Sequence, residues 1–508
     1  MKLLYVSSRS VSVLLNGDGD FLMSSPVSLS LNGISLGEEK RSVISLFDLS
    51  PDTDYTLSFH SSSFGDSSLS FRTDKEAVTL DVHRFGAKGN GEADDTAALQ
   101  AAILSCPAGG RVLVPAGNYL TGPLFLKSHL TLELQKGAVL RLTTDRSRFP
   151  ILPGMTFPAG QGDDLILGAW EGNPLDIFAS ALTGIQVRDV RIIGEGVIDG
   201  QAPDGDWWKH PKEKIGAYRG SLFFLMNSED ITVQGITFRN SPAWNIHPMF
   251  SRNLSFLNIS VEAPAVSPNT DGFDPESCEG IRLFGALFSV GDDCIALKSG
   301  KIYLGQKYHI RTRDVEIAWC AMLDGHGGVT VGSEMAGGVS DVRIHHCWMR
   351  GNDRGLRIKT RRGRGKYAVV DGIRLEDIRM EGVKMPLIVN SMYFCDPDGH
   401  SPYVQSRDPQ PVDDTTPTIG SIVFERVRAS GCHACAGYIL GLPERPVRSI
   451  VVRDSEFDFD PVAAPLVPAM AEGVPPLLHQ GIIAQFVDSL TVENVSMHGL
   501  AGEMVQRL

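Results

Sequence analysis

The chain has 508 residues, 42% of them hydrophobic, and its 60 acidic against 47 basic residues give a net charge of −13. This balance excludes a general nucleic-acid binder, which needs a net basic surface for phosphate, and the lack of any run of about 18 apolar residues excludes a transmembrane helix, so no membrane partner is expected. The 53 glycines and 29 prolines stay below the share of about 25–30% that marks disorder, so a folded, loop-rich protein is expected.

The start of the chain carries no recognisable secretory signal. The apolar run Leu3–Val6 is too short for an h-region, and serines and an arginine follow it. A cytoplasmic protein is therefore expected, or a secreted one if the start is truncated.

Residues 1–76 predict a separate small module. The alternating runs Val11–Leu15 and Val27–Leu31 are separated by turn signals, as in hairpins. Pro51, Thr53 and Tyr55 then lead into another alternating strand, which resembles the tyrosine corner of fibronectin type III-like sandwiches. We expect a fibronectin type III-like β-sandwich here.

The remainder, residues 77–508, begins with a helix and continues as strands. Asp94, Asp95 and Thr96 precede an alanine-rich apolar run, which predicts a capped helix over 94–104. Short β-branched strands then recur about every 20–30 residues without intervening helices, as expected of a solenoid and not of a sandwich or a doubly wound fold. We predict a right-handed parallel β-helix whose strands include the following: 130–134, 190–193, 231–233, 254–256, 281–284, 315–317, 342–344 and 373–375.

The eight cysteines are spread thinly along the chain, unlike a disulfide scaffold. Cys432 and Cys435 form a lone CxxC without a second pair, so we expect reduced, mostly buried thiols and no metal site.

Four polar clusters interrupt the strand pattern in order. They are Asn269–Gly272, Gly291–Cys294, Gly325–Gly327 and Arg357–Lys359. Their spacing fits successive coils, which lie about 4.8 Å apart, so three carboxylates, an imidazole and two cations are expected along one groove.

Each cluster alone has a simpler interpretation, because Asp-Gly and Gly-His-Gly sequences are common in turns. Their occurrence together in successive coils favours a site. Adjacent carboxylates repel one another, and one consequence is a raised pKa for one of them. A carboxylic acid that stays protonated beside ionised carboxylates is what cleavage of a glycosidic bond requires.

Together, these four clusters resemble the signatures of the polygalacturonase family, glycoside hydrolase family 28, in both order and spacing. The flanking residues 327–334 and 353–363 are similar to its bacterial, exo-polygalacturonase-like branch. The resemblance runs from about residue 78 to the region of Tyr393, and we expect it to continue to the end of the chain.

The resemblance implies inverting hydrolysis of α-1,4-linked galacturonate, without a cofactor or metal, and galacturonate oligomers or polymer as the partner. It makes Asp292 the general acid, and it implies that Asp271 and Asp293 hold and deprotonate the attacking water. His326 would help to set the protonation states of these aspartates. An inverting pair is expected to be about 6.5–9.5 Å apart.

The basic run at 357–366 fits a polyanionic substrate. The resemblance makes Arg357 and Lys359 substrate-binding residues and matches Tyr393 to a substrate-contacting tyrosine. Strand alternation places Arg361 on the same face as Arg357 and Lys359.

Two local features depart from a simple strand or from the family pattern. Strict alternation would send Asp292 and Asp293 to opposite faces, so the backbone must turn or bulge at Gly291. In related fungal enzymes the cysteine at Cys294 pairs with one four residues before the motif histidine. Met322 stands there in this chain, which puts that disulfide in doubt.

Three other functions remain open at this stage. A pectate lyase shares the β-helix but eliminates, usually with calcium and an Arg or Lys base. A hydrolase of rhamnogalacturonan or xylogalacturonan is a second alternative. A non-catalytic binding β-helix, like an adhesin, is the third.

The long irregular segments predict attack at a chain end. Residues 144–181, with Phe149, Pro150 and Trp170, and residues 201–219, with Trp207 and Trp208, are longer than ordinary loops. Their aromatic and basic side chains suit a wall that closes one end of the groove, so exo action is expected.

Overall fold

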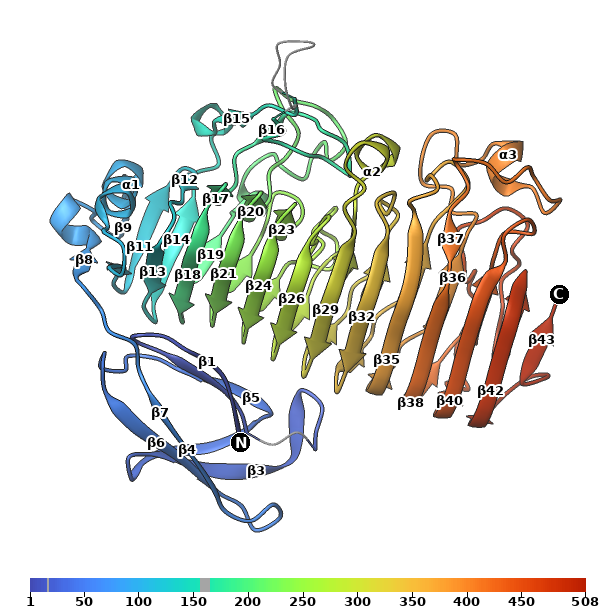
Figure 1. Cartoon of the computed structure of the whole chain (residues 1–508), viewed down its shortest axis with the longest axis horizontal. Helices are drawn as coiled ribbons and strands as arrows, with labels where there is room; N and C mark the ends of the chain where they lie inside the picture. Colours follow the sequence, from blue (N-terminus) through green and yellow to red (C-terminus); the bar gives the residue numbers. More distant parts are fainter. Residues whose placement is uncertain (16–17, 156–164) are drawn as a thin grey trace.

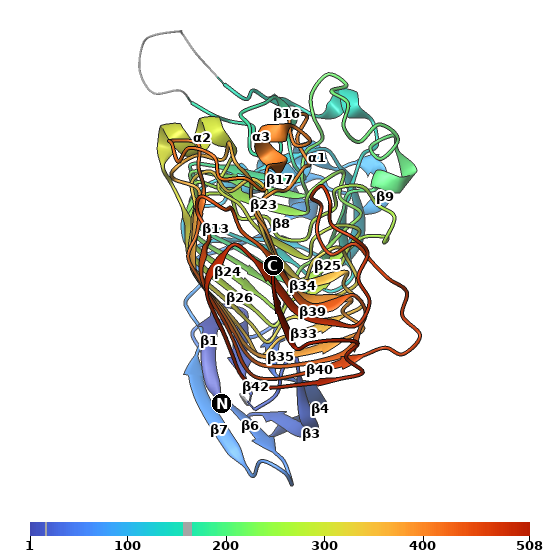
Figure 2. The ribbon, with the colours of Figure 1, turned by 90° about the vertical axis from the view of Figure 1, so that its right-hand side faces the viewer.

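The computed structural model describes residues 1–15, 18–155 and 165–508, and it shows a long parallel β-helix with a small module packed against it (Figure 1). Viewed from the carboxyl-terminal end, the coils stack behind one another and the module lies beneath them (Figure 2). The predicted fold class, a right-handed parallel β-helix preceded by a small β-sandwich, is confirmed. None of the helices in the described residues has the length and apolar character that a membrane span requires.

The amino-terminal module consists of two antiparallel sheets around a common apolar core. The Tyr55 hydroxyl accepts a hydrogen bond from the Ser50 amide at 2.9 Å, as expected for a tyrosine corner. The strands are β1 (Lys2–Val6), β2 (Val11–Leu14) and β5 (Val43–Leu46) in one sheet, and β3 (Leu22–Leu31), β4 (Ile34–Arg41), β6 (Asp54–His60) and β7 (Ser67–Arg72) in the other.

The first ladder of the β-helix contains all eight strands expected from the repeat, in parallel register. Its members are β8 (Thr79–Asp81), β10 (Arg111–Val114), β13 (Leu130–Leu134), β18 (Arg188–Gly194), β21 (Glu229–Gln234), β24 (Arg252–Leu257), β26 (Glu279–Phe284), β29 (Thr312–Ala318), β32 (Val339–His345), β35 (Val369–Glu381), β38 (Ser421–Cys432), β40 (Val447–Phe459) and β42 (Val487–His498).

A second ladder follows the first in each coil until the two merge in the long strands from β35 onward. It contains β9 (Asn90–Asp94), β11 (Gly117–Thr121), β14 (Ala138–Leu142), β19 (Val197–Asp199), β22 (Thr237–Arg239), β25 (Ser260–Glu262), β27 (Leu287–Ser289), β30 (Ala321–Leu323) and β33 (Trp348–Arg350).

A third ladder completes the coil, and Phe273 bridges its two halves by pairing with Ile246 and Ile295. Its strands are β12 (Leu124–Phe125), β17 (Leu182–Ile185), β20 (Phe223–Met226), β23 (Ile246–Met249), β28 (Ile295–Leu297), β31 (Val329–Val331), β34 (Arg354–Lys359), β36 (Met385–Asn390), β39 (Cys435–Leu440), β41 (Gln480–Gln485) and β43 (Val505–Arg507). The short strands β15 (Ile151–Leu152) and β16 (Ile177–Phe178) pair with each other outside the three ladders, and β37 (Thr418–Ile419) pairs with the start of β35 in the first ladder.

The predicted helix is α1 (Thr96–Ser105), at the amino-terminal end of the coils. The Asp95 carboxylate does not cap it, because it accepts hydrogen bonds from the amides of Lys88 and Gly89 instead. Two short helices, α2 (Ile302–Tyr308) and α3 (Pro402–Gln405), were not predicted, because neither is long enough to show an apolar period.

The β-helix interior is a continuous apolar core in which aromatic side chains from successive coils pack edge to face. Phe256 lies between Phe223 and Phe273, with ring centroids 6.5 and 4.7 Å apart. Core residues alternate with outward-facing ones along each strand, so the pattern that fills the interior also fixes which side chains reach the surface.

The module packs on the turns between the first and second ladders, on the side away from α2 (Figure 1). Gln234 is fully buried there; its side chain accepts a hydrogen bond from the Ser10 hydroxyl at 2.6 Å and donates one to the Ser12 hydroxyl at 2.7 Å. Trp319 and Phe284 of the β-helix join Leu14 and Val43 of the module in a small apolar cluster.

Replacing Gln234 with Met should destabilise the chain by about 1–3 kcal/mol, because both serine hydroxyls lose a buried partner. Chemical denaturation measures the change in the free energy of unfolding. Adding Ser12→Ala to Gln234→Met should cost less than the sum of the two single changes, since both changes remove the same hydrogen bond between Gln234 and Ser12. Strict additivity would contradict this coupling.

Candidate active site

The candidate site lies on the outward face of the third ladder, where the polar clusters of successive coils come together. Ile295, Val329 and Leu356 are paired in register and point into the core. Their neighbours Ala296, Thr330 and Arg357 therefore point outward. The four clusters lie on neighbouring coils, as the sequence predicts.

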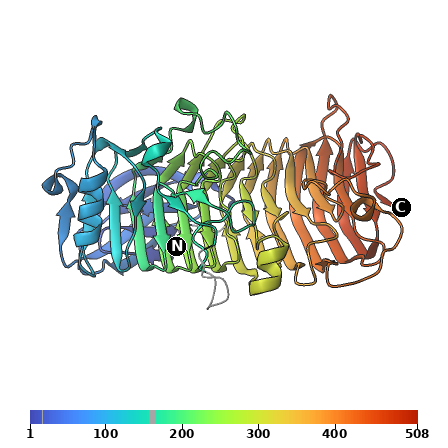
Figure 3. The same cartoon turned by 90° about the horizontal axis from the view of Figure 1, so that it is seen from above.

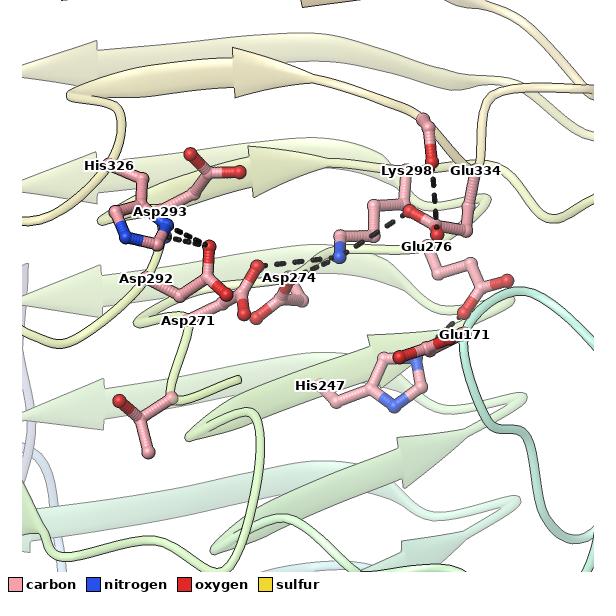
Figure 4. A network of polar contacts seen from close by, with 12 residues as sticks. Glu171, His247, Asp271, Asp274, Glu276, Asp292, Asp293, Lys298, His326 and Glu334 are labelled. Carbon is pink, nitrogen blue, oxygen red and sulfur yellow. Dashed lines mark hydrogen bonds and ion pairs between the residues drawn. The ribbon is translucent and has the colours of Figure 1, made fainter. Parts of the chain in front are cut away.

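The three aspartates form one group. Asp271, Asp292 and Asp293 each place a carboxylate oxygen within 4.8 Å of the others (Figure 4). Backbone pairing fixes this closeness, because the Gly272 amide donates to the Asp293 carbonyl at 3.0 Å across neighbouring coils. At these oxygens the carboxylates are closer than the separation of about 6.5–9.5 Å expected for an inverting pair, since the stacking distance of the coils holds them together.

Asp292 and Asp293 both reach the group because they lie in a turn between β27 and β28. This agrees with the expectation that alternation breaks here. A side chain at Gly291 would lie 2.3 Å from the Ser267 carbonyl oxygen, and one at Gly327 would lie 2.7 Å from the Asp293 carboxylate. Both positions need glycine because the chain passes so close to its neighbours.

The two buried members of the group have opposite proton affinities. Burial raises the pKa of Asp271 to about 7, and the nearby Asp292 adds to this effect. Burial would also raise the pKa of Asp293, but Lys359 and Arg357 outweigh it and hold that pKa well below its usual range. The predicted raised pKa within the group therefore belongs to Asp271.

His326 lies at the rim of the group and is half-exposed. Its Nδ1 is 3.2 Å from the Asp292 carboxylate, and its backbone amide donates to the Asp292 carbonyl. The hydrogen bond to Asp292 raises the pKa of His326.

Arg357 and Lys359 are buried beside Asp293. Their nitrogens lie 3.5 and 2.9 Å from its carboxylate oxygens. The ring of Tyr393 covers both cations, with its centroid 5.7 Å from Arg357 and 5.6 Å from Lys359. The structure thus brings Tyr393 to the pair that the sequence singled out.

Arg361 lies apart from this group. Strand β34 ends at Lys359, so the alternation that was expected to place Arg361 on the same face does not extend to it. Its guanidinium instead pairs with Asp396 at 3.2 Å and Asp398 at 2.7 Å.

Three charged residues beside Asp271 were missed in the sequence. Lys298 lies between Asp271, Asp274 and Glu334, at 3.5, 3.1 and 3.6 Å from their carboxylate oxygens. Alternation could have found Lys298 and Asp274, because each follows an inward-facing apolar residue of the third ladder, Leu297 and Phe273. Glu334 lies in a turn and gave no such signal.

The aspartate group could in principle accept a cation, but protein cations already occupy its surroundings, because Lys298 contacts Asp271, and Arg357 and Lys359 contact Asp293. Another acidic cluster, Glu456, Asp458 and His498, lies on β40 and β42. Neither group includes Cys432 or Cys435. All eight cysteines are free, and only Cys395 is exposed, which agrees with the expectation of mostly buried, unpaired thiols.

The third ladder is covered on the amino-terminal side of the aspartates. Outward-facing Phe224, Met226 and Met249 are fully buried in an apolar cluster with Trp170 and its neighbours from the segment 144–181. Residues 156–164 of this segment lie outside the described part of the chain.

The two long segments, 144–181 and 201–219, meet over this covered part of the third ladder (Figure 3). The ring of Trp170 stacks on Tyr218 with centroids 5.3 Å apart, and Arg219 donates to the Asn269 side chain at 2.7 Å, close to Asp271. The backbone carbonyl of Gly172, in the segment 144–181, accepts a hydrogen bond from the Lys301 amide at 2.8 Å.

The third ladder is also covered on the carboxyl-terminal side of the aspartates. Outward-facing Ile388 and Tyr438 are buried with Ala469 and Ala471 in a second apolar cluster. Met470 lies over Arg357, with its sulfur 3.6 Å from the guanidinium. The open part of the ladder is therefore confined to the coils that carry the aspartates.

Comparison with known proteins points to one family. Residues 111–432, which include every candidate site residue, match the model of glycosyl hydrolases family 28. Residues 79–133, which include none of them, match the model described as rhamnogalacturonase A/epimerase, pectate lyase-like. A probable polygalacturonase from Vitis vinifera is 34% identical over 376 residues, which cover 72% of each chain.

Two further proteins are similar at lower identity. An endo-polygalacturonase from Pectobacterium parmentieri is 28% identical over 316 residues, or 59% of this chain and 72% of that protein. A family 28 exopolygalacturonase from Yersinia enterocolitica superposes with a TM-score of 0.69 over 97% of both chains at 18% identity, a likeness of fold.

Replacing Asp271 with Asn should remove a pH dependence of stability. Because the folded pKa of about 7 lies above the ordinary 3.8, the neutral form stabilises the fold fully below 3.8, and this contribution is lost as pH rises through about 7. The permanently neutral variant should therefore be more stable than the parent chain above that range, by up to about 4 kcal/mol.

Denaturant unfolding measured across this pH range provides the check. Asp488→Asn, at an exposed position of β42, is the matched control and should behave like the parent. A constant stability difference between Asp271→Asn and the parent at all pH values would contradict the raised pKa.

Proposed function

The chain belongs to glycosyl hydrolases family 28, and on this premise we propose that it hydrolyses α-1,4-galacturonosidic bonds with inversion, from one end of galacturonate oligomers or polymer. The observation that carries the proposal is the aspartate group, which holds a proton up to near neutral pH beside two buried cations suited to a uronate. This combination supplies both an acid and a carboxylate-binding site.

In the proposed mechanism, the three aspartates share one proton. Asp293 stays ionised because Lys359 and Arg357 stabilise its charge. The proton that Asp271 holds in the free site moves within the group to Asp292, which is the most accessible of the three. A coupled group of this kind titrates as a unit.

The bond then breaks in one displacement. Asp292 donates its proton to the leaving glycosidic oxygen as the bond from that oxygen to the anomeric carbon breaks. A water held by Asp271 and Asp293 forms the new bond on the opposite face and gives a proton to one of these carboxylates. His326, at 3.2 Å from Asp292, assists reprotonation of the acid.

Arg357 and Lys359 supply the charge that a uronate needs. An arginine guanidinium binds a carboxylate through two parallel hydrogen bonds, and lysine adds a point charge. Tyr393 shields both from water, which strengthens their attraction for an anionic sugar.

The same cations argue against elimination. A lyase needs a neutral Arg or Lys to remove a proton. Burial lowers the pKa of Arg357 and of Lys359, but Asp293 outweighs it and raises both. Each side chain therefore stays protonated and is a poor base.

The proposal of exo action rests on the side chains that cover the third ladder on both sides of the aspartates. An endo-acting enzyme needs an open trough along which a polymer lies on both sides of the cleaved bond. Here Trp170 and its neighbours cover the ladder on one side of the aspartates, and Ala469 and Ala471 cover it on the other. A chain end fits such a site better than a chain interior.

Asp292→Asn should lower turnover on polygalacturonate at least about 100-fold, since general acid catalysis contributes about 10²–10⁴-fold. Product chromatography measures turnover and identifies the products. NMR at early times gives the anomeric configuration of the products that the parent chain releases. Saturated products with inverted configuration are expected. An unsaturated product, retention, or full activity of Asp292→Asn would contradict the mechanism.

Exo action should release monomer or dimer from the start while the viscosity of polygalacturonate hardly changes. Viscometry alongside a reducing-sugar assay tests this, with an endo-acting polygalacturonase as the control. A rapid fall in viscosity before reducing sugar accumulates would refute the exo mode and leave the hydrolysis itself in place.

A further inference from the structure

Lys298 is a buried cation among three carboxylates (Figure 4). Its Nζ lies 3.1 Å from Asp274, 3.5 Å from Asp271 and 3.6 Å from Glu334. The ring centroid of Trp244 is 3.6 Å from the same nitrogen. With 4% of its surface exposed, Lys298 is held in one position by contacts on several sides.

The charge on Lys298 is permanent over the working pH range. Burial lowers the pKa of Lys298, but Asp271, Asp274 and Glu334 outweigh this and raise it well above its usual value. The cation–π contact with Trp244 adds attraction without offering a proton acceptor.

Several charges face Asp271, but they differ in distance. Asp274, Asp292 and Asp293 repel its anion. Lys359 is engaged at 2.9 Å with Asp293, and Arg219 binds the Asn269 side chain and backbone carbonyls. Among the ion pairs of the described residues, Lys298 makes the one direct contact of Asp271 with a cation.

We propose that Lys298 is a positioning residue that sets the pH range in which the three catalytic aspartates share a single proton, by holding a fixed positive charge against Asp271. The inference rests on the hydrolysis proposed above. Lys298 acts through Asp271 and needs no contact with the substrate.

The direction of the effect follows from electrostatics. An adjacent cation favours the ionised form of a carboxyl and so weakens its hold on a proton. Without Lys298 the aspartate group would bind both its first and its second proton more tightly. Turnover that needs one protonated and one ionised carboxyl gives a bell-shaped pH profile. The whole profile should therefore move to higher pH.

Lys298→Met removes the charge while keeping a long, unbranched side chain. We expect both limbs of the kcat profile on polygalacturonate to shift upward by about one pH unit or more, because an opposite charge within about 4–6 Å moves a carboxyl by about 1–3 units. Lys298→Arg keeps the charge and should keep the profile close to that of the parent. If Lys298→Met does not fold, Lys298→Gln takes its place in the same test.

Lys301→Met is the matched control. Lys301 is on the same coil and is partly buried, and its Nζ pairs with Asp396 at 3.1 Å instead of with Asp271. Its loss should leave the positions of both limbs unchanged. Thermal unfolding of every variant separates lost folding from altered protonation.

Three outcomes would overturn the proposal: an unshifted profile for Lys298→Met, an equal shift for Lys301→Met, or a shift for Lys298→Arg as large as that for Lys298→Met. A rise in KM without a shift would also overturn it, since it would make Lys298 a substrate-binding residue. Product analysis of the parent chain is independent of these variants, so failure of the proposed hydrolysis and failure of this inference are distinguishable.

Discussion

The hydrogen bonds that hold successive coils about 4.8 Å apart are the constraint on which the candidate site depends. They tie the backbone of Gly272 to that of Asp293, so Asp271 cannot move away from its neighbours without breaking the ladder. Three carboxylates held this close cannot all ionise at low cost. The sharing of one proton is thus a consequence of the fold's repeat distance.

The surrounding cations offset the repulsion among the carboxylates and make the Asp271 side of the group differ from the Asp293 side. Lys298 lies on the Asp271 side of the group, and Arg357 and Lys359 lie on the Asp293 side. A buried charge without a partner would cost several kcal/mol, so each side needs its own cation. Because two cations contact Asp293, at 3.5 and 2.9 Å, and only one of the ion pairs among the described residues reaches Asp271, at 3.5 Å, the proton rests at the Asp271 side of the free site.

The two apolar clusters that cover the third ladder serve stability and shape together. Phe224, Met226 and Met249 would be exposed apolar side chains on a bare β-helix, and burying them under Trp170 stabilises both the ladder and the segment. The same contacts end the open surface near the aspartates. The module, packed through Gln234 on the other side of the coil, leaves this surface clear.

The sequence by itself determined the repeat, the predicted strands of the first ladder and the membership of the aspartate group, because strand alternation and motif spacing are local properties that the parallel ladder preserves. Only the tertiary structure decided the separation of the carboxylates, which the stacking of neighbouring coils sets. It also decided that Arg361 pairs with Asp396 and that Lys298 contacts Asp271, since these contacts join residues 35 and 27 positions apart on different coils. Which aspartate keeps the proton depends on burial and on cations from other coils, and neither is encoded in the spacing of the motif.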